Sequence, residues 1–241
     1  MIFKDIPKYV INLKRRPERL KHISNEMSYI NWDHLVHDGV DTNSHVGCTL
    51  SHYEIIKEAK IKGFDNVMII EDDCVFMPYA HSLIEDIEKK HPDLDFGIIN
   101  LAPTHNRPVN KSNYEMFLDT TNFPPKEDHH RGVFATNMLI YNNKTYDDVL
   151  HFVDSGLHKT YAIDDYLYSE VMSKKQSYCP ILPIAPQKAS WSDVSGGEYN
   201  NFHTQTYNWN LYCPTKIPNK FLDYNSVQEY KESGKYLTYE S

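Results

Sequence analysis

The amino-acid sequence predicts an α/β domain: a Rossmann-like, mixed and mostly parallel sheet flanked by helices. Buried strands are expected at short apolar runs rich in β-branched residues, at 8–13, 66–70, 95–101 and 133–141. Segments with helical spacing of apolar residues separate most of these runs, and such alternation is typical of parallel sheets. The 241 residues fit one domain, so we expect a single domain with its core at about 8–195 and an aromatic-rich segment at 196–241.

Local signals set the boundaries of the elements. The first strand ends at a basic turn, and Pro17 starts a helix that runs to about Tyr29. A helix following Gly47 ends at Gly63, a residue suited to the left-handed conformation after a helix. The stretch at 102–131, rich in Pro, Asn, His and charge, is expected to be a functional or mobile loop. The other expected elements are a strand at 34–37, helices at 79–90 and 143–154, a shorter helix from Asp164 and a last strand at 178–184.

Charge and composition exclude several classes of function. The formal net charge is -8, which disfavours a broad phosphate-binding surface, so no nucleic-acid partner is expected. No apolar run approaches the length of a membrane span, and the first residues lack the zones of a signal peptide. The 4 cysteines form no CxxC pair, so reduced thiols are expected. These features together predict a cytoplasmic protein with no membrane span.

Three consecutive carboxylates, Glu71, Asp72 and Asp73, follow the strand at 66–70. Ligands of α/β sheets bind beyond the carboxyl ends of the strands, where these acids are expected to lie. Carboxylates this close raise one another's pKa, and a divalent cation such as Mn²⁺ or Mg²⁺, which prefers oxygen ligands, removes the conflict. Alternation along an extended chain predicts Glu71 and Asp73 on one side, with Asp72 opposite. A solvated acidic turn is the simpler alternative.

A basic turn follows the first strand and contains Lys14, Arg15, Arg16 and Arg19. Arginine binds phosphate oxygens bidentately, and this turn lies at the same predicted edge of the sheet as the three acids. The turn is therefore a candidate site for a diphosphate, although a solvated first turn of a helix also explains such a run.

Two further groups are candidates for chemistry. Ser51 and His52 lie near a predicted helix start, where free N–H groups favour anions, although a packed histidine is the alternative. Asp164 and Asp165 open an apolar stretch, and one of these carboxylates is a candidate base for an attacking hydroxyl. Helix capping explains the same pair, because Asp is favoured at helix starts.

Four blocks of sequence together resemble glycosyltransferase family 25, which includes bacterial lipooligosaccharide glycosyltransferases and collagen (hydroxylysine) galactosyltransferases. The blocks are YVINLKRRPERL at 9–20, GCTLSH at 47–52, VMIIEDDCVF at 67–76 and IDDYLYSEV at 163–171. Weaker similarity occurs in FATNMLIY at 134–141 and SDV at 192–194. The resemblance spans about residues 8–195, which is most of the chain.

The resemblance implies a GT-A fold, a UDP-sugar donor, commonly UDP-galactose, and transfer to a hydroxyl of a saccharide or of hydroxylysine. It implies Mn²⁺ (or Mg²⁺) held by Glu71, Asp72 and Asp73, with Asp73 the first choice of ligand. Asp164 matches the family's V-D-x-[FY]-L block and is the implied base, with Asp165 beside it. The residues implied to line or approach the uridine diphosphate site are Asn12, Leu13, Arg15, Arg16, Arg19, Ser51 and His52.

The sequence departs from the family where Asn137-Met138 replaces the usual aromatic position, a change that bears on acceptor contacts. Asp193 is a candidate for an additional metal ligand from the C-terminal part. Two rival classes stay open. An NDP-sugar nucleotidyltransferase would have a glycine-rich loop after its first strand, whereas NLKRRPER contains no Gly. A catalytically silent domain that binds a carbohydrate or a partner is the other rival.

Overall fold

A seven-stranded mixed sheet forms the centre of the protein, with the strand order β2-β1-β3-β8-β4-β9-β6. The computed structural model describes residues 3–42, 44–105, 117–120, 133–180, 182–192 and 197–199. The strands of the sheet are β1 (Lys8–Asn12), β2 (Leu35–Asp38), β3 (Asn66–Glu71), β4 (Ile98–Asn100), β6 (Phe117–Asp119), β8 (Met138–Asn142) and β9 (Ser177–Pro180).

The direction of the strands confirms the predicted mixed, mostly parallel sheet. Strand β1 is parallel to β2 and β3, and β9 is parallel to β4. Strand β8 is antiparallel to both β3 and β4, so β4 runs in the same direction as β3. Strand β6 is antiparallel to β9, and five of the seven strands therefore point the same way.

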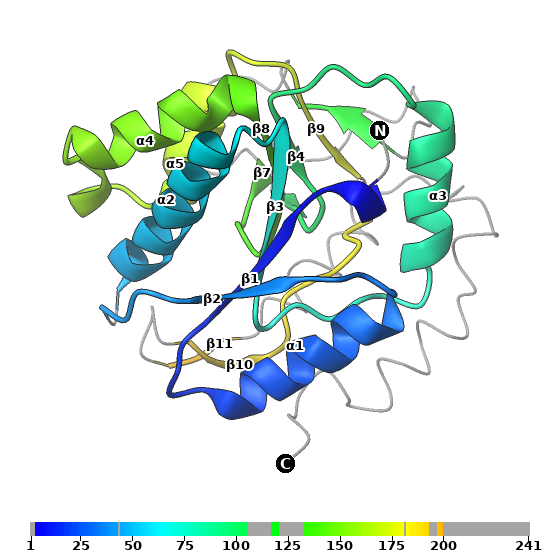
Figure 1. The fold of residues 1–241 in the computed structure, drawn as a ribbon, viewed down its shortest axis with the longest axis horizontal. Helices are drawn as coiled ribbons and strands as arrows, with labels where there is room; N and C mark the ends of the chain where they lie inside the picture. The colour runs from blue at the N-terminus through cyan, green and yellow to red at the C-terminus, as the bar shows by residue number, and fades with distance from the viewer. Residues whose placement is uncertain are drawn as a thin grey trace.

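Helices cover both faces of this sheet (Figure 1). One hydrophobic cluster joins the sheet to α1 (Pro17–Tyr29) and α3 (Ala80–Lys90). A second cluster joins the opposite face to α2 (His45–Lys62), α4 (Tyr146–Asp154) and α5 (Ile163–Tyr166), which continues as a π-helical stretch, η4 (Leu167–Met172). Short 3-10 helices are η1 (Phe3–Asp5), η2 (Asn143–Thr145) and η3 (Leu157–Lys159), and two small sheets pair β5 (Thr104–His105) with β7 (Val133–Phe134) and β10 (Ser190–Ser192) with β11 (Gly197–Tyr199).

The two faces of β3 explain why the sheet holds two cores. Met68 and Ile70 belong to the first cluster, whereas Val67 and Ile69 belong to the second, because successive side chains of a strand point to opposite faces. All four side chains are completely buried. The apolar run at 66–70 is therefore that of a central strand, buried on both faces, and its carboxyl end carries the acidic triplet.

Local signals explain several boundaries and correct others. Pro17 occupies the start of α1, and Gly63, at φ 69°, ends α2 in the left-handed conformation. Helix α2 begins earlier than predicted, at His45, because the side chain of Ser44 accepts a hydrogen bond from the N–H of Val46 and caps the helix. The predicted strand at 133–141 is split, since the chain turns at Ala135, where φ is 76°.

Other boundaries shift by a few residues. The predicted strand at 95–101 is shorter and spans Ile98–Asn100, and the predicted helix at 143–154 starts with the 3-10 turn η2. No helix among the described residues is both long enough and apolar enough to cross a membrane. Three expected features lie mainly or wholly outside the described residues. They are most of the loop at 102–131, most of the aromatic-rich segment at 196–241, and Asp193.

Candidate active site

The acidic triplet lies where β3 ends, beside the carboxyl end of its parallel neighbour β1. Strand β3 stops at Glu71, and Asp72 and Asp73 form a turn. The prediction that Glu71 and Asp73 share one side is therefore wrong, because the extended backbone that would produce the alternation ends before Asp72. Instead Asp72 and Asp73 both approach Arg19, while Glu71 contacts a separate group of side chains.

Asp72 is held by Asn12, the last residue of β1, and by Arg19 in α1. Nη1 of Arg19 in α1 lies 3.0 Å from Oδ1 of Asp72, and Nδ2 of Asn12 donates a hydrogen bond of 2.7 Å to Oδ2. All three residues are at most 8% exposed. Both oxygens of Asp72 thus have protein partners, and this buried ion pair ties the basic turn to the end of β3.

Asp73 has an unsatisfied oxygen. Its Oδ2 accepts a hydrogen bond of 3.0 Å from Nε2 of Gln187 and lies 3.6 Å from Nη1 of Arg19. Its Oδ1 is buried and, among the described residues, has no hydrogen-bond partner. Burial raises the pKa of Asp73 to about 8 despite the opposing charge of Arg19, and the charges of Glu71 and Asp72 add to the rise.

This orphaned oxygen fits a divalent cation. A buried carboxylate oxygen without a donor is costly, and a hard cation such as Mn²⁺ or Mg²⁺ takes oxygen ligands of this kind. The backbone holds Asp73 in place, because its carbonyl accepts a hydrogen bond of 2.6 Å from the N–H of Lys188. The structure therefore supports Asp73, and not Asp72, as the acid with an oxygen to spare for a metal.

Glu71 lies in a second group with Cys48 and Thr136. Its Oε1 accepts hydrogen bonds from Oγ1 of Thr136 at 2.7 Å and from Sγ of Cys48 at 3.7 Å. Burial is the main reason that the pKa of Glu71 is raised, and the negative charges of Asp72 and Asp164 also contribute. The influence of Asp164 indicates that this residue belongs to the same corner of the protein.

Asp164, in the single turn of α5, is the better placed of the two candidate bases. Burial raises its pKa, and the charge of Asp165 adds to the rise, whereas hydrogen bonds from the backbone of Asp165 and Ala135 oppose it. The backbone of Ala135, which hydrogen-bonds to Asp164, is in the left-handed region, at φ 76°. Asp165 is exposed, so the structure separates the two adjacent acids.

Most of the basic turn points away from the acids. Lys14 pairs with Asp38 at 2.8 Å, Arg15 pairs with Asp41 at 2.6 Å, and Arg16 lies 3.5 Å from Glu18. These pairs lie at the surface, whereas Arg19 is 8% exposed and reaches the acidic corner. The structure thus brings Asn12 and Arg19 together with the acids and leaves Arg15 and Arg16, with the half-buried Leu13 before them, at the rim.

Ser51 and His52 are inside the protein. Ser51 donates a hydrogen bond of 2.8 Å to the carbonyl of Gly47 and accepts one from the N–H of Val40. The Nδ1 atom of His52 lies 3.0 Å from the hydroxyl of Tyr141, and burial lowers the pKa of His52 to about 3. Both residues are at most 1% exposed, so neither side chain lies at a surface open to a sugar donor. The prediction that Ser51 and His52 lie near free N–H groups assumed a later helix start. Helix α2 begins at His45, so both residues lie beyond the free N–H groups of its first turn.

Three contributors to the site were not identified from the sequence. Gln187 contacts Asp73, Thr136 contacts Glu71, and Asn100 holds the turn at Ala135 through a hydrogen bond of 2.9 Å to its carbonyl. Thr136 lies in the weakly similar block at 134–141, whereas Asn100 and Gln187 are ordinary polar residues outside every block. Gln187 reaches the site because residues 184–188 run beside the chain after β3, where the N–H of Val75 donates to the carbonyl of Pro186.

The fold and this corner define an α/β protein with a candidate ligand site at the carboxyl ends of sheet strands. Residues 42–147 match the model of glycosyltransferase family 25, described as an LPS biosynthesis protein. The match contains the block at 47–52 and the acidic triplet, and it confirms the resemblance to this family and supports glycosyltransfer as the class of function.

Comparison with solved structures gives more distant similarities. A glycosyltransferase involved in glycosylation of the major capsid of PBCV-1 has 10% identity and a TM-score of 0.41, with 67% of this chain and 73% of that chain covered. A putative glucose-1-phosphate thymidylyltransferase from Bacillus anthracis has 8% identity and a TM-score of 0.37, with 67% and 80% covered. Scores this low carry no argument about chemistry. No curated protein matches the chain.

Proposed function

We propose that the protein transfers a sugar, galactose in the first instance, from a UDP-sugar to a hydroxyl acceptor in a metal-dependent reaction with inversion at the anomeric carbon. The observation that carries this proposal is the buried Oδ1 of Asp73, just after β3, which has no partner among the residues that the structure describes. A donor diphosphate brings a divalent cation with it, and such a cation shares its coordination between protein carboxylates and phosphate oxygens. The family match to residues 42–147 supports the same class of reaction.

Each part of the corner has a role in this proposal. Asp73 would hold the cation, and Mn²⁺ or Mg²⁺ bound there would neutralise the charge that develops on the leaving diphosphate. Asn12 and Arg19 keep Asp72 in place beside Asp73. Arg15, Arg16 and the neighbouring Leu13 would meet the outer phosphate and the nucleoside in this proposal.

Asp164 is the proposed base. The acceptor oxygen forms a bond to the anomeric carbon, the bond from that carbon to the diphosphate oxygen breaks, UDP departs, and the hydroxyl proton passes to Asp164. The partly buried setting that raises the pKa of Asp164 makes it a stronger base than a solvated carboxylate. The family's description as LPS biosynthesis protein favours a saccharide over hydroxylysine as the acceptor.

Calorimetric titration with UDP, in the presence and absence of Mn²⁺, tests the metal site. The unmodified protein is expected to bind UDP more tightly with Mn²⁺, and Asp73→Asn is expected to lose that gain. Asp93→Asn, which changes an exposed carboxylate, is the matched control and should bind like the unmodified protein. If Asp73→Asn and the unmodified protein bind UDP equally tightly with Mn²⁺, Asp73 does not hold the cation. Release of UDP from a panel of UDP-sugars then identifies the sugar.

A further inference from the structure

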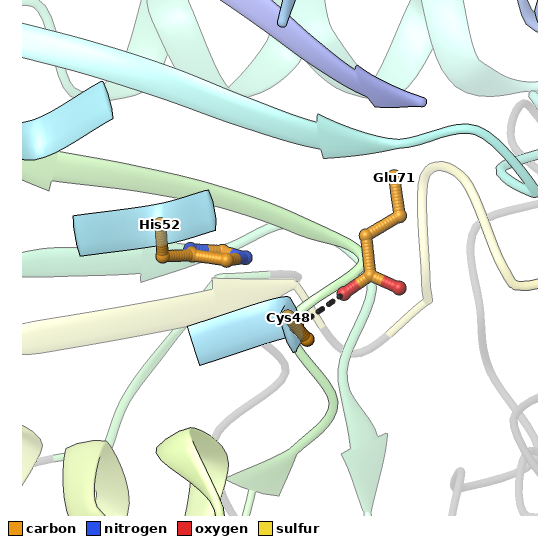
Figure 2. Close-up of side chains that lie close together, drawn as sticks. All are labelled: Cys48, His52 and Glu71. Atoms are coloured by element: carbon orange, nitrogen blue, oxygen red, sulfur yellow. Dashed lines mark hydrogen bonds between the residues drawn. The ribbon is translucent and has the colours of Figure 1, made fainter. Parts of the chain in front are cut away.

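Cys48, His52 and Glu71 form a second cluster of potential metal ligands, separate from Asp73. One ligand atom of each, the thiol sulfur, an imidazole nitrogen and a carboxylate oxygen, lies within 4.8 Å of the other two. Figure 2 shows Cys48 and His52 on neighbouring turns of α2 and Glu71 facing them from the end of β3. The spacing of four residues places Cys48 and His52 on one side of the helix.

The ring of His52 gives a second, independent indication of a metal ligand. The side chain of His52 is completely buried, and its Nε2 has no hydrogen-bond partner among the described residues. Its other nitrogen, Nδ1, lies 3.0 Å from the hydroxyl of Tyr141. Histidines that bind a metal through one nitrogen almost always use the other in a hydrogen bond that fixes the ring, and this is the arrangement of His52.

We propose that Cys48, His52 and Glu71 bind a zinc ion that joins the first turns of α2 to the end of β3. Thiolate, imidazole and carboxylate are the ligand set of Zn²⁺, whereas Mn²⁺ and Mg²⁺ prefer sites made of oxygen alone. Tetrahedral Zn–S and Zn–N bonds of about 2.3 and 2.0 Å place ligand atoms about 3.5 Å apart, so small side-chain rotations close the site.

Zinc binding would replace the hydrogen bond between Cys48 and Glu71 with bonds from both residues to the ion, and it needs no further reactant. The Cys48 thiol, which donates to Glu71 at 3.7 Å, loses its proton to solvent, and the sulfur and the carboxylate oxygen both turn to the ion. The hydroxyl of Thr136, 2.7 Å from Glu71 and 3.8 Å from Cys48, or a water completes the fourth position. Zinc at this site would use Glu71 and the other cation would use Asp73, so the two metal sites do not share a ligand.

Cobalt substitution tests this site, because a thiolate bound to Co²⁺ gives a charge-transfer absorption that carboxylates and histidines alone do not give. The full chain, stripped with a chelator, is expected to bind one Zn²⁺ tightly by competition with a chromophoric chelator, and Co²⁺ is expected to produce the thiolate band. Cys48→Ser should abolish the band. Tyr141→Phe, which keeps all three ligands, should weaken Zn²⁺ affinity about tenfold to a hundredfold.

Two controls separate this proposal from others. Cys179→Ala removes a different buried thiol and should keep both the band and the Zn²⁺ affinity. Asp73→Asn should also keep the band while it loses Mn²⁺-dependent UDP binding, so failure of one metal site is distinguishable from failure of the other. Absence of tight Zn²⁺ binding by the unmodified chain, or a thiolate band that persists in folded Cys48→Ser, would overturn the zinc site.

Discussion

Asp164 and Asp165 are adjacent in sequence, yet their surroundings differ. Asp164 is partly buried and accepts a hydrogen bond from the backbone of Ala135, whereas Asp165 is exposed. Asp164→Asn keeps the shape of the side chain and removes the base, so turnover is expected to fall about a hundredfold to ten-thousandfold. Affinity for UDP with Mn²⁺ should stay nearly the same. Rates of UDP release and calorimetry measure the two effects, and Asp165→Asn is the comparison. A larger loss of rate in Asp165→Asn than in Asp164→Asn would show that Asp165, and not Asp164, is the base.

At the level of single residues, the sequence predicted the location of the acids better than their contacts. An apolar run followed by three carboxylates places Glu71, Asp72 and Asp73 at the end of a strand, as observed. Which way each side chain points depends on where the strand stops, and it stops at Glu71. The partner of Asp73, Gln187, is 114 residues away in sequence, so no local pattern could have revealed it.

The first turn of α2 shows how an element depends on close packing. A Cβ atom at Gly47 would lie 2.3 Å from the carbonyl oxygen of Val40 and 2.8 Å from Oγ1 of Thr42. Alanine favours helices, but here the overlap is expected to dominate, and Gly47→Ala should lower the free energy of unfolding by about 1–3 kcal/mol. Urea denaturation measures this change. Lys57→Ala, on the exposed side of the same helix, should stay within about 0.5 kcal/mol of the unmodified protein.

Strand β1 contains a buried lysine that makes stability depend on pH. Lys8 is 3% exposed, donates hydrogen bonds to the carbonyls of Lys4 and Ile6, and lies over the ring of Trp32. Burial lowers its pKa from 10.5 to about 8. Between these values the unfolded chain binds more protons than the folded one, so this group adds stability as pH rises through that window.

The measurement compares the unmodified protein with Lys8→Met, because tyrosines and cysteines also titrate at alkaline pH. From pH 8 to 9.5 the free energy of unfolding of the unmodified protein should rise by about 1–2 kcal/mol relative to Lys8→Met. Urea denaturation at several pH values gives this difference. Parallel pH curves for the two proteins would show that Lys8 keeps its proton throughout.

At the level of elements, prediction succeeded where a local signal marks the boundary. Helix α1 spans Pro17–Tyr29, as predicted, because Pro17 marks its first turn and an apolar stripe continues from there. The split of the run at 133–141 was not predicted, since the left-handed backbone at Ala135 occurs at a residue that gives no sign of it. Asn100 stabilises that turn from another strand, and such a contact depends on the tertiary structure.

Strand β3 is one of the strands that join the two halves of the molecule, because both hydrophobic clusters include its side chains. Ile69 and Ile70 point to opposite faces, and both are completely buried. Truncation of either one leaves a cavity, so Ile69→Ala and Ile70→Ala are each expected to lower the free energy of unfolding by about 2–5 kcal/mol. Since the sheet joins both clusters, each variant should still unfold in one cooperative transition, followed by circular dichroism and by tryptophan fluorescence.

An exposed isoleucine gives the matched control. Ile61 in α2 is 78% exposed, so Ile61→Ala should change the free energy of unfolding by less than about 0.5 kcal/mol. Two separated transitions in Ile69→Ala, with Ile70→Ala unaffected, would instead mean that the two faces unfold independently. The acids at the end of β3 would then be anchored by one face alone. A single transition in both variants indicates that the site and both cores unfold together. Strand β3, which ends at Glu71, packs against both cores, so it cannot leave one core and stay in the other.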